Sequence, residues 1–180
     1  MFYIFLANGF EEIEALCPYD LLLRADIDVK TVSVNETKRV TGTHGIAVEA
    51  DALISELDLD GDFSGIMLPG GMPGASNLEA NEKVQAFITK ANEEGKLITA
   101  ICAAPFILGN RGLLEGKEAV CFPGFEEYLK GAVISDKKVV TCGNIITAKG
   151  MGVAFDFGIE TVKYFKGEEF ALELKAKTQA

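Results

Sequence analysis

Apolar runs alternate along the chain with segments of helical periodicity, and this alternation predicts the order of the elements. Short apolar runs, typical of buried strands, lie at 2–6, 28–34, 64–69, 96–101, 139–141 and 145–148, with a further short strand expected at 45–49. Segments with helical spacing lie at 11–25, 81–94, 152–165 and, richer in charge, 168–177. Strands that alternate with helices indicate an α/β fold, a mostly parallel sheet with helices on both faces.

Breaker residues support two of these boundaries. Gly95 directly follows the amphipathic segment 81–94 and is expected to end that helix. Pro105 follows the strand 96–101 and is expected in the first turn of a helix, where a missing N–H does no harm. In open parallel sheets, ligands bind outside the carboxyl ends of the strands. That rule directs attention to the loops 7–14, 69–77 and 100–105.

Length, composition and charge narrow the class of protein. The 180 residues are 48% hydrophobic, which suits a single packed domain spanning 1–180. The net charge of −10 argues against a nucleic-acid binder and against attachment to anionic membranes, and no apolar run reaches spanning length. The four cysteines lack the spacing of a metal site or a disulfide framework, so we expect no metal and no cofactor, and a reducing cytoplasm as the location.

Cys102 is the first candidate for chemistry. It lies in AICAAP, a small–x–nucleophile–x–small pattern between a predicted strand and a predicted helix, as in a nucleophile elbow. The following helix would direct its free N–H groups at the sulfur and lower the pKa of the thiol. A small buried cysteine with a purely structural role is the alternative.

Two further loops supply candidate partners. LPGGMPG follows a strand, and the N–H of Gly71 together with that of Ala103 can form an oxyanion hole; a plain turn rich in breakers is the alternative. Glu14 lies on the first predicted helix, where a buried carboxyl beside a thiolate would keep its proton and act as general acid or base. His44 is the only histidine, in a turn-like segment typical of a solvated surface group.

Taken together, the loops resemble the ThiJ/PfpI family, also called the DJ-one superfamily. The resemblance rests on NGFEEIEALCPYDLLLRA, IMLPGGMPGASNL, ITAICAAPFILGNRGLL, CFPGF and NIITAKGMGVAFDFGIE, which together cover nearly the whole chain. It implies a flavodoxin-like fold and a homodimer. It also implies that Cys102 is the elbow cysteine with a strained backbone, Glu14 the protonated acid at the sulfur, and Gly71 and Ala103 its backbone donors.

The resemblance implies three kinds of function. The first is action on reactive dicarbonyls such as methylglyoxal or on glycation adducts, as a cofactor-free glyoxalase or deglycase with small aldehydes or glycated molecules as partners. The second is a redox sensor or stress chaperone that uses the same oxidisable cysteine. The third is a cysteine peptidase or amidase, which needs a histidine base.

Two departures from the family pattern bear on the third function. Ala103 stands where the peptidase-like branch has a histidine, and Phe122 stands where the DJ-one protein has a histidine before proline. Only His44 is left as a possible accessory residue, and the resemblance, in which the matching turn lies near the dimer interface, implies that it could enter from a dimer partner.

Overall fold

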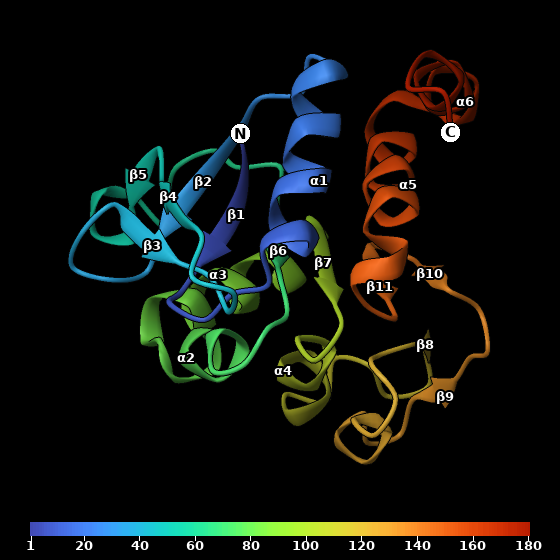
Figure 1. Cartoon of the computed structure of the whole chain (residues 1–180). Helices are drawn as coiled ribbons and strands as arrows, with labels where there is room; N and C mark the ends of the chain where they lie inside the picture. The colour runs from blue at the N-terminus through green and yellow to red at the C-terminus, as the bar shows by residue number, and fades with distance from the viewer.

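A seven-stranded sheet forms the centre of the computed structural model, which describes residues 1–180 (Figure 1). The strands lie in the order β10-β11-β7-β6-β1-β2-β5, and every neighbouring pair is parallel except β10 and β11. Their bounds are β1 Phe2–Leu6, β2 Val29–Ser33, β5 Ala52–Leu53, β6 Gly65–Leu68, β7 Leu97–Ile101, β10 Val139–Cys142 and β11 Ile145–Ala148.

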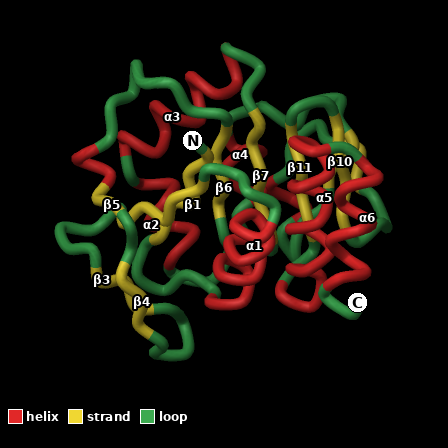
Figure 2. Tube along the Cα trace, turned by 90° about the horizontal axis from the view of Figure 1, so that it is seen from above, coloured by secondary structure: helices red, strands yellow, loops and turns green.

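Helices cover both faces of the sheet, as the view from above shows (Figure 2). The helices α2 Gly74–Ala80, α3 Glu82–Glu93 and α4 Pro105–Asn110 contribute to the apolar core on one face. The helices α1 Glu12–Arg24, α5 Ala154–Lys166 and α6 Glu168–Lys177 contribute to the core on the other face. Successive residues of β1 serve opposite cores, with Phe5 in the first and Ile4 in the second, as strand geometry requires.

The strand order identifies the fold as flavodoxin-like. The parallel strands β2-β1-β6-β7-β11 follow the 2-1-3-4-5 order of that architecture, so the predicted three-layer α/β sandwich is confirmed. The order reverses between β1 and β6. A crevice at such a switch point is where ligands bind in these folds, and β7 lies directly beside it.

Each strand and helix expected from the sequence is present within a few residues of its predicted bounds. The elements that were not predicted are short: β3 Arg39–Thr41, which pairs with β4 Ala47–Glu49, then β5, α2, β8 Glu118–Ala119, β9 Val133–Ile134, and the 3₁₀ turns η1 Ile54–Glu56, η2 Glu126–Tyr128 and η3 Met151–Val153. Elements of two to seven residues are too short to show a hydrophobic period. None of the helices combines the length and the apolar character needed to cross a membrane.

Candidate active site

The loops after β1, β6 and β7 meet at the switch point. Gly70 O accepts a hydrogen bond from Glu11 N at 3.0 Å, which ties the loop after β6 to the start of α1. Gly74 N donates to Gly9 O at 3.1 Å, a second link between the same loops. The turn at Cys102 follows β7, the neighbour of β6 in the sheet. The three loops expected at the carboxyl ends of the strands therefore lie side by side.

Cys102 occupies a strained turn. Its φ is +63°, in the left-handed region that side chains other than glycine rarely adopt. Two hydrogen bonds hold the residue there: its N–H donates to Ala148 O at 2.9 Å, and its carbonyl accepts from Phe122 N at 2.7 Å. Ala100 and Ala104 are fully buried, so the small residues of the elbow pattern stand where space is shortest. Cys102 itself is only partly buried.

Glu14 reaches the sulfur from α1. The Glu11 side chain caps this helix by accepting a hydrogen bond from Glu14 N at 2.7 Å, which fixes the first turn. The Glu14 side chain is buried, and its Oε2 accepts from Gly70 N at 3.0 Å. It also hydrogen-bonds Cys102 and accepts from the N–H of Met151. A carboxyl with this many fixed partners has a single defined position beside the sulfur.

Two glycines make this approach possible. A Cβ added at Gly70 would lie 2.5 Å from Glu14 Oε2 and 2.6 Å from the Cβ of Cys102, so any side chain there would push into the pair. Gly71 has φ +83°, which turns its N–H toward the sulfur. The N–H of Ala103 is the second donor to the sulfur. The structure thus brings Cys102, Glu14, Gly71 and Ala103 together.

Burial raises the affinity for protons of both acids of the site. Burial raises the pKa of the Cys102 thiol to about 12, with help from the charge of Glu14 and from their hydrogen bond, while the N–H groups of Ala103 and Gly71 oppose the rise. Burial also raises the pKa of Glu14 to about 7, although its hydrogen bonds lower it. In such a coupled pair, the two protons leave in steps that belong to both groups, here near pH 7 and near pH 12.

This result corrects the expectation that the following helix lowers the pKa of the thiol. That helix, α4, has only six residues, so its dipole is small, and burial outweighs the two backbone donors. Once the pair has lost its first proton, the Glu14 carboxylate can accept the remaining proton from the thiol when the sulfur reacts. Ionisation of Cys102 at neutral pH therefore depends on its partner carboxyl.

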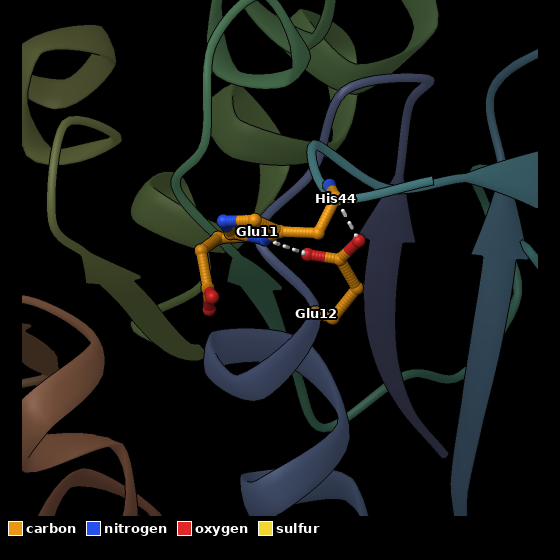
Figure 3. A group of neighbouring side chains, drawn as sticks. All are labelled: Glu11, Glu12 and His44. Carbon is orange, nitrogen blue, oxygen red and sulfur yellow. Dashed lines mark hydrogen bonds and ion pairs between the residues drawn. The ribbon is translucent and has the colours of Figure 1, made fainter. Parts of the chain in front are cut away.

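His44 binds a different glutamate (Figure 3). Its N–H donates to Glu12 Oε1 at 2.8 Å, and its Nδ1 lies 2.9 Å from Glu12 Oε2. Glu12 is buried, and the hydrogen bond with His44 and those with Thr43 and the backbone overcome its burial to lower its pKa to about 2. The only histidine of the chain therefore fastens the loop between β3 and β4 to α1, and it is engaged there rather than at Cys102.

Glu12 and His44, with Glu11, also have the spacing of a metal site. Their potential ligand atoms all lie within 4.8 Å of one another. The carboxylates of Glu11 and Glu12 are already engaged in hydrogen bonds with the chain itself. The cluster therefore has a structural explanation: Glu11 caps α1, and Glu12 with His44 holds the loop between β3 and β4 against α1.

An apolar groove runs beside the reactive pair, and the sequence motifs that supply its residues did not reveal that they form it. A cavity of about 340 Å³ is lined by Phe122, Pro123, Lys149, Gly150, Met151, Gly152 and Val153. A Cβ at Gly150 would lie 3.2 Å from the Phe122 ring and 3.8 Å from Glu14 Oε1, so the ring and the carboxyl are near neighbours. The signals in the sequence were CFPGF, and KGMG directly after a predicted strand, a position where ligand loops occur.

The other cysteines lie in different settings. Cys121 is buried, and burial raises the pKa of its thiol to about 11. Burial and the charge of Asp20 raise the pKa of Cys17 on α1. None of the four cysteines forms a disulfide. Cys102 is the one that combines partial exposure with backbone donors and a carboxyl at its sulfur.

Comparison with known proteins gives consistent matches over the chain. The sequence model of the DJ-1/PfpI family matches residues 2–164. Protein DJ-1 homolog B of Arabidopsis thaliana is 38% identical over 171 residues, which are 94% of this chain but 39% of that protein. The chain thus spans well under half the length of this relative. Deglycase PfpI of Pyrococcus furiosus is 32% identical over 162 residues, 89% of this chain and 96% of that protein.

Solved structures agree with the sequence matches. A cysteine-to-alanine mutant of a DJ-1 superfamily protein from Salmonella typhimurium superposes with a TM-score of 0.93 at 36% identity, covering 99% of this chain and 97% of that one. Oxidised DJ-1 of Toxoplasma gondii superposes with a TM-score of 0.94 at 32% identity, with the same coverage.

Proposed function

The chain belongs to the DJ-1/PfpI family, and from this membership we propose that it is a cofactor-free, cysteine-dependent enzyme acting on reactive dicarbonyls or early glycation adducts. The observation that carries the proposal is the Glu14 carboxyl hydrogen-bonded to Cys102 in a strained turn. Relatives named as deglycases, from Pyrococcus furiosus and Pyrococcus abyssi, support the substrate class. A homodimer is part of the proposal.

The first step is addition of sulfur to the aldehyde carbon of methylglyoxal. In the singly protonated pair the proton lies mainly on Cys102, whose pKa is the higher of the two, and the Glu14 carboxylate takes that proton as the sulfur attacks. A C–S bond forms, the carbonyl electron pair moves to oxygen, and Glu14 gives that oxygen its proton. The N–H groups of Gly71 and Ala103, which hydrogen-bond the sulfur, are the donors that we propose for the developing oxyanion. The product is a hemithioacetal.

The second step moves a proton within the adduct. The Glu14 carboxylate removes the proton from the former aldehyde carbon and returns a proton to the neighbouring carbon, while the hydroxyl proton passes to the former ketone oxygen, which leaves a lactoyl thioester on Cys102. Water then breaks the C–S bond and returns a proton to the sulfur, which releases lactate and one proton and restores the singly protonated pair. The sum is methylglyoxal plus water to lactate plus a proton, with no net oxidation and no cofactor.

Turnover of methylglyoxal by the purified protein tests the proposal. Lactate is expected from the wild type, none from Cys102→Ala, and only a small residual rate from Glu14→Gln, with circular dichroism reporting an intact fold in each variant. Unchanged rates in either variant would remove the mechanism. Cys121→Ala is the matched control and is expected to keep full activity.

A redox-sensing role is the second candidate, and it uses the same sulfur. The two N–H donors at Cys102 would stabilise the negatively charged sulfenate or sulfinate that oxidation produces. The solved Toxoplasma gondii relative is described as oxidised. Intact-mass analysis after mild peroxide is expected to show stepwise oxygen addition at Cys102 alone. An even spread over the four cysteines would exclude this role.

A peptidase or amidase activity has the least support of the three candidate functions. Such an enzyme needs a histidine base at the cysteine, and the only histidine of this chain is held by Glu12. The structure supplies no base from the same chain for that reaction.

A further inference from the structure

A second cavity lies beside the elbow, on the side of the sheet away from Glu14. It has a volume of about 170 Å³ and is lined by Met72, Ser76, Glu79, Phe106, Asn110, Phe125 and Tyr128. Two of its walls continue directly from the active-site loops. Met72 follows Gly71, and Phe106 lies in the first turn of α4, just after the Cys102 turn.

Three aromatic rings form one part of the wall. The ring centroids of Phe106, Phe125 and Tyr128 lie 5.8 to 6.3 Å apart, with tilted or edge-on geometry between them. Phe106 is almost fully buried, whereas Tyr128 is 41% exposed. The face of an aromatic ring carries partial negative charge, so such a cluster attracts cations and disfavours anions.

A carboxylate without a cationic partner completes the wall. Glu79 Oε1 accepts a hydrogen bond from Asn110 Nδ2 at 2.6 Å, and this contact fixes the side chain against α4. No lysine, arginine or histidine of the chain forms an ion pair with Glu79. Its second oxygen has no hydrogen-bond partner in the chain. The charge of this wall is therefore uncompensated within the protein.

We propose that this cavity binds a small organic cation, the guanidinium or ammonium end of a ligand or of a peptide side chain. Rings and a carboxylate together match a planar, weakly hydrated cation, which can lie against the rings while its N–H groups bind Glu79. The volume suits a group of that size. The net charge of −10 adds long-range attraction for cations. The site would select positively charged ligands that also reach Cys102, and that consequence rests on the proposed function, whereas the binding itself does not.

Methionine-methyl NMR of the whole protein tests the proposal without any turnover. The chain has four methionines; Met72 lines this cavity, whereas Met151 lines the other groove and serves as an internal control. Titration with methylguanidinium is expected to shift the Met72 methyl signal to saturation at millimolar concentration and to leave Met151 unmoved. N-methylurea, neutral and of the same shape, is expected to shift neither.

Variants make the test specific to the carboxylate. Glu79→Gln is expected to weaken methylguanidinium binding roughly tenfold or more, the loss typical of a charge-assisted hydrogen bond. Glu173→Gln on α6 removes the same charge elsewhere and is expected to change nothing. Binding of N-acetyl-Gly-Arg-Gly-amide more tightly than methylguanidinium would identify a peptide side chain as the source, and weaker binding a free small cation. An unmoved Met72 signal, an equal response to N-methylurea, or full binding by Glu79→Gln would overturn the proposal.

Discussion

The carboxyl group of Glu14 hydrogen-bonds the sulfur of Cys102, although Glu14 lies in the first turn of α1 and Cys102 directly follows the strand β7. Burial raises the pKa of both groups, so neither can ionise as it would in water. Their shared site therefore behaves as one acid that loses a proton near neutral pH. That property connects the stability of the fold with the reactivity of the cysteine.

Replacing Glu14 is expected to stabilise the protein at higher pH. The pKa of Glu14 in the folded state, about 7, is above its ordinary value of 4.5, so its contribution to stability is complete below pH 4.5 and is lost as the pH rises through 7. The loss corresponds to at most about 3 kcal/mol at 1.36 kcal/mol per pKa unit. Denaturant titrations at about pH 5 and about pH 8.5 measure the free energy of unfolding of both proteins. Relative to the wild type, Glu14→Gln should be more stable at about pH 8.5 than at about pH 5. If the difference in unfolding free energy between the two proteins is the same at both pH values, the raised pKa of the buried Glu14 carboxyl is contradicted.

Gly70→Ala is expected to separate the reactive pair without unfolding the protein. The new Cβ would stand 2.5 Å from Glu14 Oε2, so the carboxyl must move away from the sulfur. We expect alkylation of Cys102 by iodoacetamide at neutral pH to slow by about tenfold or more, since the carboxylate that accepts the thiol proton is displaced. Gly152→Ala, where a Cβ meets nothing within 4 Å, is the matched control. Equal rates in both variants would show that the close packing at Gly70 has no role.

Phe122→Ala is expected to admit water to the pair. The Phe122 ring lies beside Gly150 and close to Glu14, so its removal reduces the burial that raises the pKa of the carboxyl. The pKa of Glu14 should fall from about 7 toward its ordinary 4.5, and the pH midpoint of Cys102 alkylation should fall with it. Leu172→Ala, an exposed apolar position on α6, is the control. A midpoint that stays in place would mean that the ring does not shield the site.

His44→Ala is expected to leave methylglyoxal turnover unchanged and to lower thermal stability. The hydrogen bond with Glu12 and the charge of that residue raise the pKa of His44 above its ordinary 6.5. Its stabilising effect is therefore complete below pH 6.5 and is lost as the pH rises through the folded-state pKa. Melting temperatures should differ most in mild acid, with His44→Gln intermediate because it keeps a donor. Loss of turnover in a stable His44→Ala protein would instead point to histidine-assisted catalysis.

The fold could be predicted from the sequence because apolar runs that alternate with segments of helical periodicity indicate a parallel sheet covered by helices. The elbow at Cys102 was visible because a tight turn demands small residues at Ala100 and Ala104. The roles of Gly70 and Phe122 were not visible, because their nearness to Glu14 arises only when three loops meet in space. The protonation of Cys102 was predicted with the wrong sign, because burial depends on every element around the sulfur and not on the helix that follows it.

The pH dependence of Cys102 alkylation, measured with and without Glu14, tests the central claim most directly. In the wild type, the rate should rise with a midpoint near pH 7, where the pair loses its first proton. In Glu14→Gln that step should disappear, and the midpoint should move above the ordinary thiol value of 9.0, because burial remains while the proton acceptor is gone. Identical profiles for the two proteins, or a wild-type midpoint at an ordinary thiol value, would contradict the shared proton.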